Sequence, residues 1–151
     1  MQYANLHLHS TYSDAGFTPS QLVKIGKALG YGALALTDHD TDGGCEVFMR
    51  ACKSEGIRTV SGAEFYAAVG KRRMHLTALD FEQTNPGLRE FIKKRCDVQA
   101  DWARECVEKG LERGIIQGIT WDDVLEYCPE NAWICADVVF QVLRVKGTMP
   151  E

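Results

Sequence analysis

The sequence predicts an α/β fold that begins with parallel β-α-β units and continues into a helical segment. Short apolar runs alternate with amphipathic stretches over residues 1–64, which is typical of parallel strands joined by right-handed helical crossovers. Polar residues of metal-binding type follow the apolar runs. From Asn85 onward, apolar residues recur at helical spacing only. We therefore predict two parts, residues 1–84 and residues 85–151.

The first predicted strand covers residues 3–7, and a helix follows it. Thr18-Pro19-Ser20-Gln21 predicts the helix start, because threonine caps, proline suits the first position and glutamine completes a capping box. Leu22, Ile25 and Leu29 predict its buried stripe, and Gly30 its end.

The second strand is the continuous apolar run 33–36, as expected of a strand buried on both faces. A helix with Val47, Phe48, Ala51 and Cys52 inward follows and ends at Gly56. A third strand is predicted over residues 58–63, directly before Glu64.

A strand pair is predicted at residues 66–68 and 74–79. Beyond residue 84, one long helix is indicated by a set of residues at helical spacing: Leu88, Phe91, Ile92, Cys96, Gln99, Trp102, Ala103 and Cys106. Thr120 with Asp123 predicts the cap of another helix. A last helix is predicted from about Ala132 to Lys146, before Gly147.

Composition is ordinary for a globular protein, with 45% hydrophobic and 25% charged residues and a net charge of −4. Residues 1–80 hold eight Lys or Arg and eight Asp or Glu, so the later residues carry the whole deficit. This excludes the basic face of a strong nucleic-acid binder. The six cysteines form no C-x-x-C pair and are expected to be reduced core residues.

No apolar run is long enough for a membrane span, and no signal-peptide pattern opens the chain. We expect a cytoplasmic location and no membrane partner.

The chemistry is predicted at the start of the chain, where His7 and His9 alternate with Leu6 and Leu8. Alternate side chains of a strand share a face, so the two imidazoles would lie side by side. Asp14 follows within reach and adds a hard oxygen ligand.

Three further residues of metal-ligand type, His39, Glu64 and His75, stand at or beside predicted strand ends, where parallel α/β folds gather their chemistry. Mixed imidazole and carboxylate ligands suit Zn, Mn or Fe. Paired ions can clamp both oxygens in phosphate ester hydrolysis, with water as the nucleophile.

Other polar and aromatic residues are given structural roles. Asp38 is expected to orient a neighbour or cap a loop, and Asp40 to open a helix N-terminus, where the dipole favours acidic residues. Arg72 and Arg73 are predicted to form a solvated hairpin tip. The three tryptophans are assigned to the core or interface of the helical part: Trp102, Trp121 and Trp133.

The motifs His7-Leu8-His9-Ser10, Ser13-Asp14, Thr37-Asp38-His39-Asp40-Thr41, Gly62-Ala63-Glu64 and His75 resemble the PHP (polymerase and histidinol phosphatase) family. The resemblance is strongest to the small bacterial phosphoesterases that act on nucleotides, and it extends to about residue 95. It implies the N-terminal part of a distorted (β/α)7 barrel followed by a helical cap. It also implies that six residues are metal ligands: His7, His9, Asp14, His39, Glu64 and His75.

This resemblance implies a hydrolase for phosphate monoesters of nucleotide-like substrates, with two or three divalent ions (Mn, Zn or Fe) in a complete site. Two alternatives are a catalytically silent metal-binding or interaction module and a histidinol-phosphate phosphatase. The sequence departs from the family pattern at Ala15, where glycine is common. No histidine follows His75, although the family completes its site with later ligands. About three strands of the family template are absent, so we expect self-association through an open barrel edge.

Overall fold

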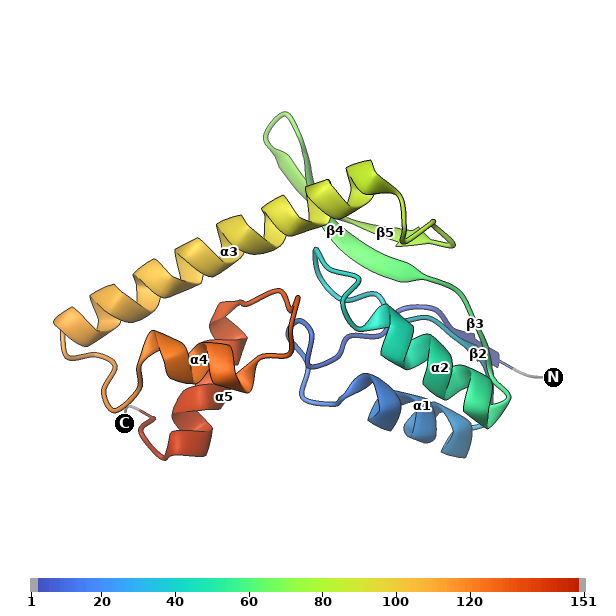
Figure 1. The fold of residues 1–151 in the computed structure, drawn as a ribbon, viewed down its shortest axis with the longest axis horizontal. Helices are drawn as coiled ribbons and strands as arrows, with labels where there is room; N and C mark the ends of the chain where they lie inside the picture. Colours follow the sequence, from blue (N-terminus) through green and yellow to red (C-terminus); the bar gives the residue numbers. More distant parts are fainter. Residues whose placement is uncertain (1–2, 150–151) are drawn as a thin grey trace.

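The computed structural model describes residues 3–149, which form a parallel sheet, a β-hairpin and a helical segment (Figure 1). The elements in chain order are β1 (Tyr3–Asn5), α1 (Pro19–Ala28), β2 (Tyr31–Leu34), α2 (Cys45–Glu55), β3 (Arg58–Thr59), β4 (Gly62–Val69), β5 (Arg72–Leu79), α3 (Pro86–Glu112), α4 (Trp121–Tyr127) and α5 (Ala136–Lys146).

The parallel sheet has the order β1-β2-β3, which confirms the predicted β-α-β units. Helices α1 and α2 lie side by side against it (Figure 1). The core between them consists of buried apolar residues: Val23, Leu34, Leu36, Phe48, Cys52 and Ile57. Parallel strands buried in this way read as continuous apolar runs, as residues 33–36 do.

Helix α1 begins at the predicted capping box. The Thr18 side chain accepts a hydrogen bond from the Gln21 backbone, and the Gln21 side chain accepts one from the Thr18 backbone. The predicted buried stripe is confirmed only at Leu22, which packs against the core; Ile25 and Leu29 are exposed, and the buried face runs through Val23 and Gly26. Close packing on β2 causes this shift: a Cβ on Gly26 would lie 2.5 Å from the Leu34 side chain.

The predicted third strand is also corrected. Strand β3 ends at Thr59, and Glu64 is the third residue of β4, which pairs antiparallel with β5. The chain leaves the parallel sheet after two residues and enters the hairpin. The predicted strand pair is therefore confirmed, with both strands longer than expected.

Backbone hydrogen bonds continue the parallel pairing beyond the strand ends. Thr37 N–H donates to the Leu8 carbonyl at 2.7 Å, and Glu64 N–H donates to the Asp38 carbonyl at 3.0 Å. His39 and Glu64 form an isolated parallel bridge. The three chain segments that carry candidate ligands are thus held next to one another.

Helices α3, α4 and α5 make up the helical segment (Figure 1), and buried apolar residues give it a core of its own. The capping box of Thr120 and Asp123 is present at the start of α4. Phe91, Trp102 and Cys106 of α3 are exposed, contrary to an inward reading of the predicted stripe. Their neighbours along the helix form its buried side: Ile92, Ala103, Val107 and Gly110.

The last helix begins at Ala136, four residues later than predicted. Residues 132–135 are instead a buried link without regular secondary structure that leads into α5. Their apolar composition resembles a helix turn, but their backbone is used to contact the first part of the chain. Gly147 ends α5 in the left-handed conformation, as predicted.

The strands of the described residues form one parallel sheet and one hairpin, and they do not close into a barrel. Within residues 3–149, no helix combines the length and apolar character needed to cross a membrane.

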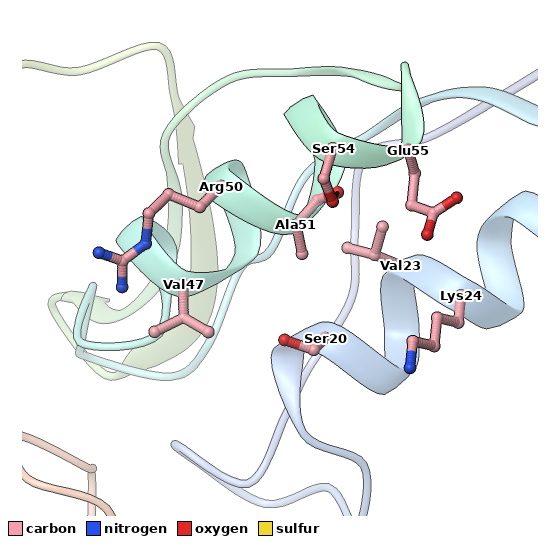
Figure 2. A pocket seen from close by; sticks show the side chains of 8 residues that line it. All are labelled: Ser20, Val23, Lys24, Val47, Arg50, Ala51, Ser54 and Glu55. Carbon is pink, nitrogen blue, oxygen red and sulfur yellow. Dashed lines mark hydrogen bonds between the residues drawn. The ribbon is translucent and has the colours of Figure 1, made fainter.

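A groove lies on the outer side of the molecule, between α1 and α2 (Figure 2). Val23 points from α1 toward α2, while Lys24, Arg50 and Glu55 supply charged groups to its rim. Arg50 pairs with Glu46 within α2 at 3.0 Å. None of the six candidate metal ligands lines this groove, so we place the chemistry elsewhere.

Candidate metal centre

Glu64 stands at the middle of a cluster of four histidines. Its Oε2 atom lies 3.2 Å from His7 Nε2, 3.2 Å from His9 Nε2 and 3.6 Å from His39 Nδ1. Its Oε1 atom lies 3.1 Å from His75 Nδ1. Because Glu64 is only 5% exposed, its charge is held away from bulk water.

A second carboxylate, Asp14, closes the other side of the cluster. It lies 3.4 Å from His39 Nε2 and 3.4 Å from His9 Nδ1. The structure therefore brings all six predicted site residues together. His7 is the most open of them, with half of its side chain exposed, while His39 is buried.

The separations fit a metal centre. Nitrogen and oxygen ligands at about 2.1 Å from a tetrahedral ion stand roughly 3.4 Å from one another. Three overlapping groups have ligand atoms within 4.8 Å of one another: His7, His9, Glu64; His9, Asp14, His39; and His39, Glu64, His75. His9, His39 and Glu64 each belong to two of these groups. Such sharing is expected of a site that holds more than one ion, with carboxylates bridging the ions.

Two further observations test this fit. The Nε2 atoms of His7 and His9 face each other at 3.0 Å, and the buried Nδ1 atoms of His9 and His39 have no hydrogen-bond partner among the described residues. Buried polar atoms of this kind need a partner. A bound cation would accept a lone pair from one nitrogen of each imidazole, so the donor set fits divalent metal ions.

The electrostatics favour negative charge at Asp14. The nearby His39 imidazole lowers the pKa of Asp14 to about 2. Burial lowers the pKa of His9 and so favours the neutral imidazole that a metal requires. Burial by itself would lower the pKa of the His39 imidazole. The hydrogen bond and charge of the Asp14 carboxylate together have a larger effect, so the pKa of His39 is raised.

Asp38 holds the loop that carries Asp14. It accepts hydrogen bonds from the Ser10 N–H at 2.6 Å, the Ser10 hydroxyl at 2.7 Å and the Ser13 hydroxyl at 2.6 Å. Burial raises the pKa of this carboxyl, and the serine hydrogen bonds oppose the rise. The structure agrees with the sequence interpretation of Asp38 as an orienting residue.

Asp40 does not open a helix, as the sequence had suggested, because α2 starts only at Cys45. Asp40 is 1% exposed, has a positive φ of 48°, and pairs with Arg95 of α3 at 2.7 Å. Its other oxygen accepts a hydrogen bond from the Tyr66 N–H at 3.2 Å. Sequence reasoning missed this contact because an ion pair 55 residues apart leaves no local pattern.

Sequence reasoning also missed two aromatic residues beside the cluster. The Tyr66 ring stacks on His39 with centroids 5.0 Å apart and meets the His75 ring edge-on at 4.3 Å. Trp133 lies 5.3 Å from His39 and 5.6 Å from Tyr66. The alternation in β4 would have pointed to Tyr66, two residues after Glu64 on the same face; nothing in the sequence points to Trp133.

Fold and site together define an α/β protein with a histidine–carboxylate cluster beyond the carboxyl ends of its parallel strands. The model of the PHP domain matches residues 5–117, and the chain belongs to the PHP family.

Two curated relatives carry enzyme names. The chain is 33% identical over 111 residues to a 5'-3' exoribonuclease of Haemophilus influenzae, covering 74% of this chain and 40% of the relative. It is 30% identical over 128 residues to a 3',5'-nucleoside bisphosphate phosphatase of Chromobacterium violaceum, covering 85% and 44%.

A solved structure from Bifidobacterium adolescentis, assigned to the metal-dependent phosphoesterases, superposes with a TM-score of 0.85 at 26% identity. The match covers 97% of this chain and 51% of that structure. The chain thus spans about half the length of the relatives it matches.

Proposed function

We propose that this chain carries the metal-binding part of a phosphoesterase that hydrolyses phosphate monoesters of nucleotide-like substrates by metal-activated water. The observation that carries the proposal is Glu64, whose two oxygens lie within 3.1 to 3.6 Å of four imidazoles. The enzyme names of the two relatives support a nucleotide-like substrate.

In this proposal, His7, His9, Asp14, His39, Glu64 and His75 hold two or three divalent ions (Mn, Zn or Fe). When bound, such ions act as Lewis acids on a phosphate oxygen and provide a nucleophile from water. The chain's own part is to aim the ligands. Glu64 and Asp14 offset the charge of the ions, and Asp38 fixes the loop of Asp14. No protein side chain is needed as the attacking group.

A second candidate function is a metal-binding module without catalysis. It is favoured by one observation: the His7 side of the cluster is half exposed. Residues 85–151 are proposed to be a helical cap in both cases.

Metal content and phosphate release separate these functions. We would purify the chain without chelator, measure bound metal by plasma mass spectrometry, and assay phosphate release from an aryl phosphate ester and a nucleoside 3',5'-bisphosphate with Mn²⁺ or Zn²⁺. Two or three equivalents of metal with release support the phosphoesterase, and metal without release supports the silent module. Absence of bound metal would overturn both.

Glu64→Gln tests the central carboxylate. It keeps the shape of the side chain and removes its charge, so we expect the loss of at least one equivalent of metal. Glu46→Gln is the matched control, because Glu46 is exposed on α2 and pairs with Arg50 of the same helix, away from the cluster. Equal metal content in wild type and Glu64→Gln would contradict the assignment of Glu64.

A further inference from the structure

Trp133 belongs to the helical core but reaches the candidate metal centre. It is 7% exposed and packs in one cluster with Val138, Val139 and other residues of the helical segment. Its backbone N–H donates to the Tyr12 carbonyl at 2.8 Å. Nearby, the Thr41 hydroxyl donates to the carbonyl of Asn131 at 2.7 Å. The link between α4 and α5 is thus anchored on both loops that flank the cluster.

The rings of Trp133, Tyr66, His39 and His75 form a continuous aromatic wall. Trp133 and Tyr66 are nearly parallel, with an interplanar angle of 25°, and Tyr66 and His39 are inclined by 29°. His75 meets both Tyr66 and His39 edge-on. Offset-stacked and edge-to-face contacts are the favoured geometries of aromatic pairs.

The polar groups that face the His39 ring are the carboxylates of the cluster itself, so packing against these rings adds a restraint from outside the cluster. A metal-binding histidine usually donates its second ring N–H to a carboxylate or a backbone carbonyl, which sets its orientation. The buried Nδ1 of His39 has no hydrogen-bond partner among residues 3–149, and its Nε2 points to Asp14 within the cluster itself. Ring packing is thus the restraint on the direction of its lone pairs that does not depend on the other candidate ligands.

We propose that Trp133, acting through Tyr66 and directly on His39, is a positioning residue of the metal centre, so that the helical segment helps to determine metal affinity. This inference rests on the proposed function, because it presupposes metal binding by the cluster. It assigns Trp133 no contact with substrate.

The first test measures Zn²⁺ affinity of the full chain by calorimetry. Partners that orient metal ligands typically change metal affinity by 10–100-fold when removed. We expect Trp133→Leu to weaken binding by about 10-fold or more, while Trp133→Phe, which keeps a ring against His39, restores most of the affinity. Trp102→Leu is the matched control, since Trp102 is 51% exposed on α3.

The second test reads the contact directly and does not remove Trp133. In Trp102→Phe/Trp121→Phe, Trp133 is the single indole of the chain. Co²⁺ quenches indoles that lie close to it, so we expect strong quenching of this variant as Co²⁺ fills the centre. If Trp133→Leu fails to fold by circular dichroism, this measurement still tests the contact with the metal centre on which the positioning role depends.

The outcomes separate the two proposals. Wild-type protein that binds neither Zn²⁺ nor Co²⁺ overturns the metal centre and this inference together. Wild-type binding with an unchanged affinity in folded Trp133→Leu, or with no quenching of the single indole, overturns the positioning role alone.

Discussion

Gly62 occupies a position at which even a methyl group has no room. A Cβ built on it would lie 2.3 Å from the Leu36 carbonyl oxygen and 3.1 Å from Thr37 Cγ2. Carbon–oxygen contacts are normally no shorter than about 3.3 Å, so Gly62→Ala creates an overlap of roughly 1 Å. Leu36 cannot move away easily, because it is 1% exposed and the next N–H, that of Thr37, bonds Leu8 at 2.7 Å.

We therefore expect Gly62→Ala to destabilise the fold by about 1–3 kcal/mol, the usual effect of overpacking a buried site. For a domain of this size, 1 kcal/mol changes Tm by roughly 2–4 °C, so a loss of about 2 kcal/mol lowers Tm by about 4–8 °C. Thermal unfolding followed by circular dichroism measures the change. Since β4 must move to relieve the overlap, and Glu64 lies two residues further on, Zn²⁺ affinity should fall as well.

Gly16→Ala is the control for this experiment. Nothing lies within 4 Å of a Cβ at Gly16, and its φ is not in the left-handed region. We expect its Tm to stay within about 1–2 °C of the wild type, as for ordinary surface substitutions. The reasoning is refuted if Gly62→Ala unfolds at the wild-type temperature, or if both variants lose equal stability.

Three other predictions follow from the site and the sheet. Arg95→Met leaves the buried Asp40 carboxylate without its cation and should destabilise the fold by about 1–3 kcal/mol. The loss is smaller than for a fully buried ion pair because Arg95 is partly exposed. Urea unfolding measures it, and an unchanged midpoint would contradict the prediction. Because the pKa of Asp14 is lowered to about 2, its stabilising effect in metal-free protein is full above pH 4 and disappears as pH falls through 2. Asp14→Asn should flatten the acid unfolding curve in that range, and a parallel curve would sink the idea. Leu6 is 41% exposed on the open face of the parallel sheet, so we expect the protein to self-associate as its concentration rises, as measured by light scattering. Val60→Lys on the same face should reduce this self-association. A stable monomer at high concentration would contradict the expectation.

The features that the sequence predicted well depend on residues close together in the chain. The capping boxes of Thr18 with Gln21 and of Thr120 with Asp123 appear as expected, because each is a contact over three residues. The two imidazoles of His7 and His9 lie side by side as predicted, although β1 ends at Asn5 and the predicted strand over residues 3–7 is too long. The meeting of His9, His39 and Glu64 was anticipated from the topology, although Glu64 lies within β4 and not at the end of the predicted third strand.

The errors have a common physical cause, which is tertiary packing that no local pattern encodes. Ile25 and Leu29 have the right spacing for a buried stripe, but the close approach of Gly26 to β2 rotates α1 toward a different face. Residues 132–135 look helical by composition, yet they are not helical, and the Trp133 N–H bonds the distant Tyr12 carbonyl. Trp133 was correctly assigned to the helical core, where it is buried. Its contact with the His39 ring was not predicted, because the two residues are far apart in the sequence.

The tie between Thr41 and Asn131 has a consequence for the order of folding. These residues are 90 positions apart, whereas His75 and Glu64 are separated by 11 and Ser10 and Asp38 by 28. Contacts between distant residues close large loops and form slowly. We expect the histidine–carboxylate cluster to assemble first, and Trp133, which follows Asn131 in the chain, to pack against it in a later kinetic phase of folding. An ion captured during synthesis would then meet a looser set of ligands than an ion offered to the finished protein.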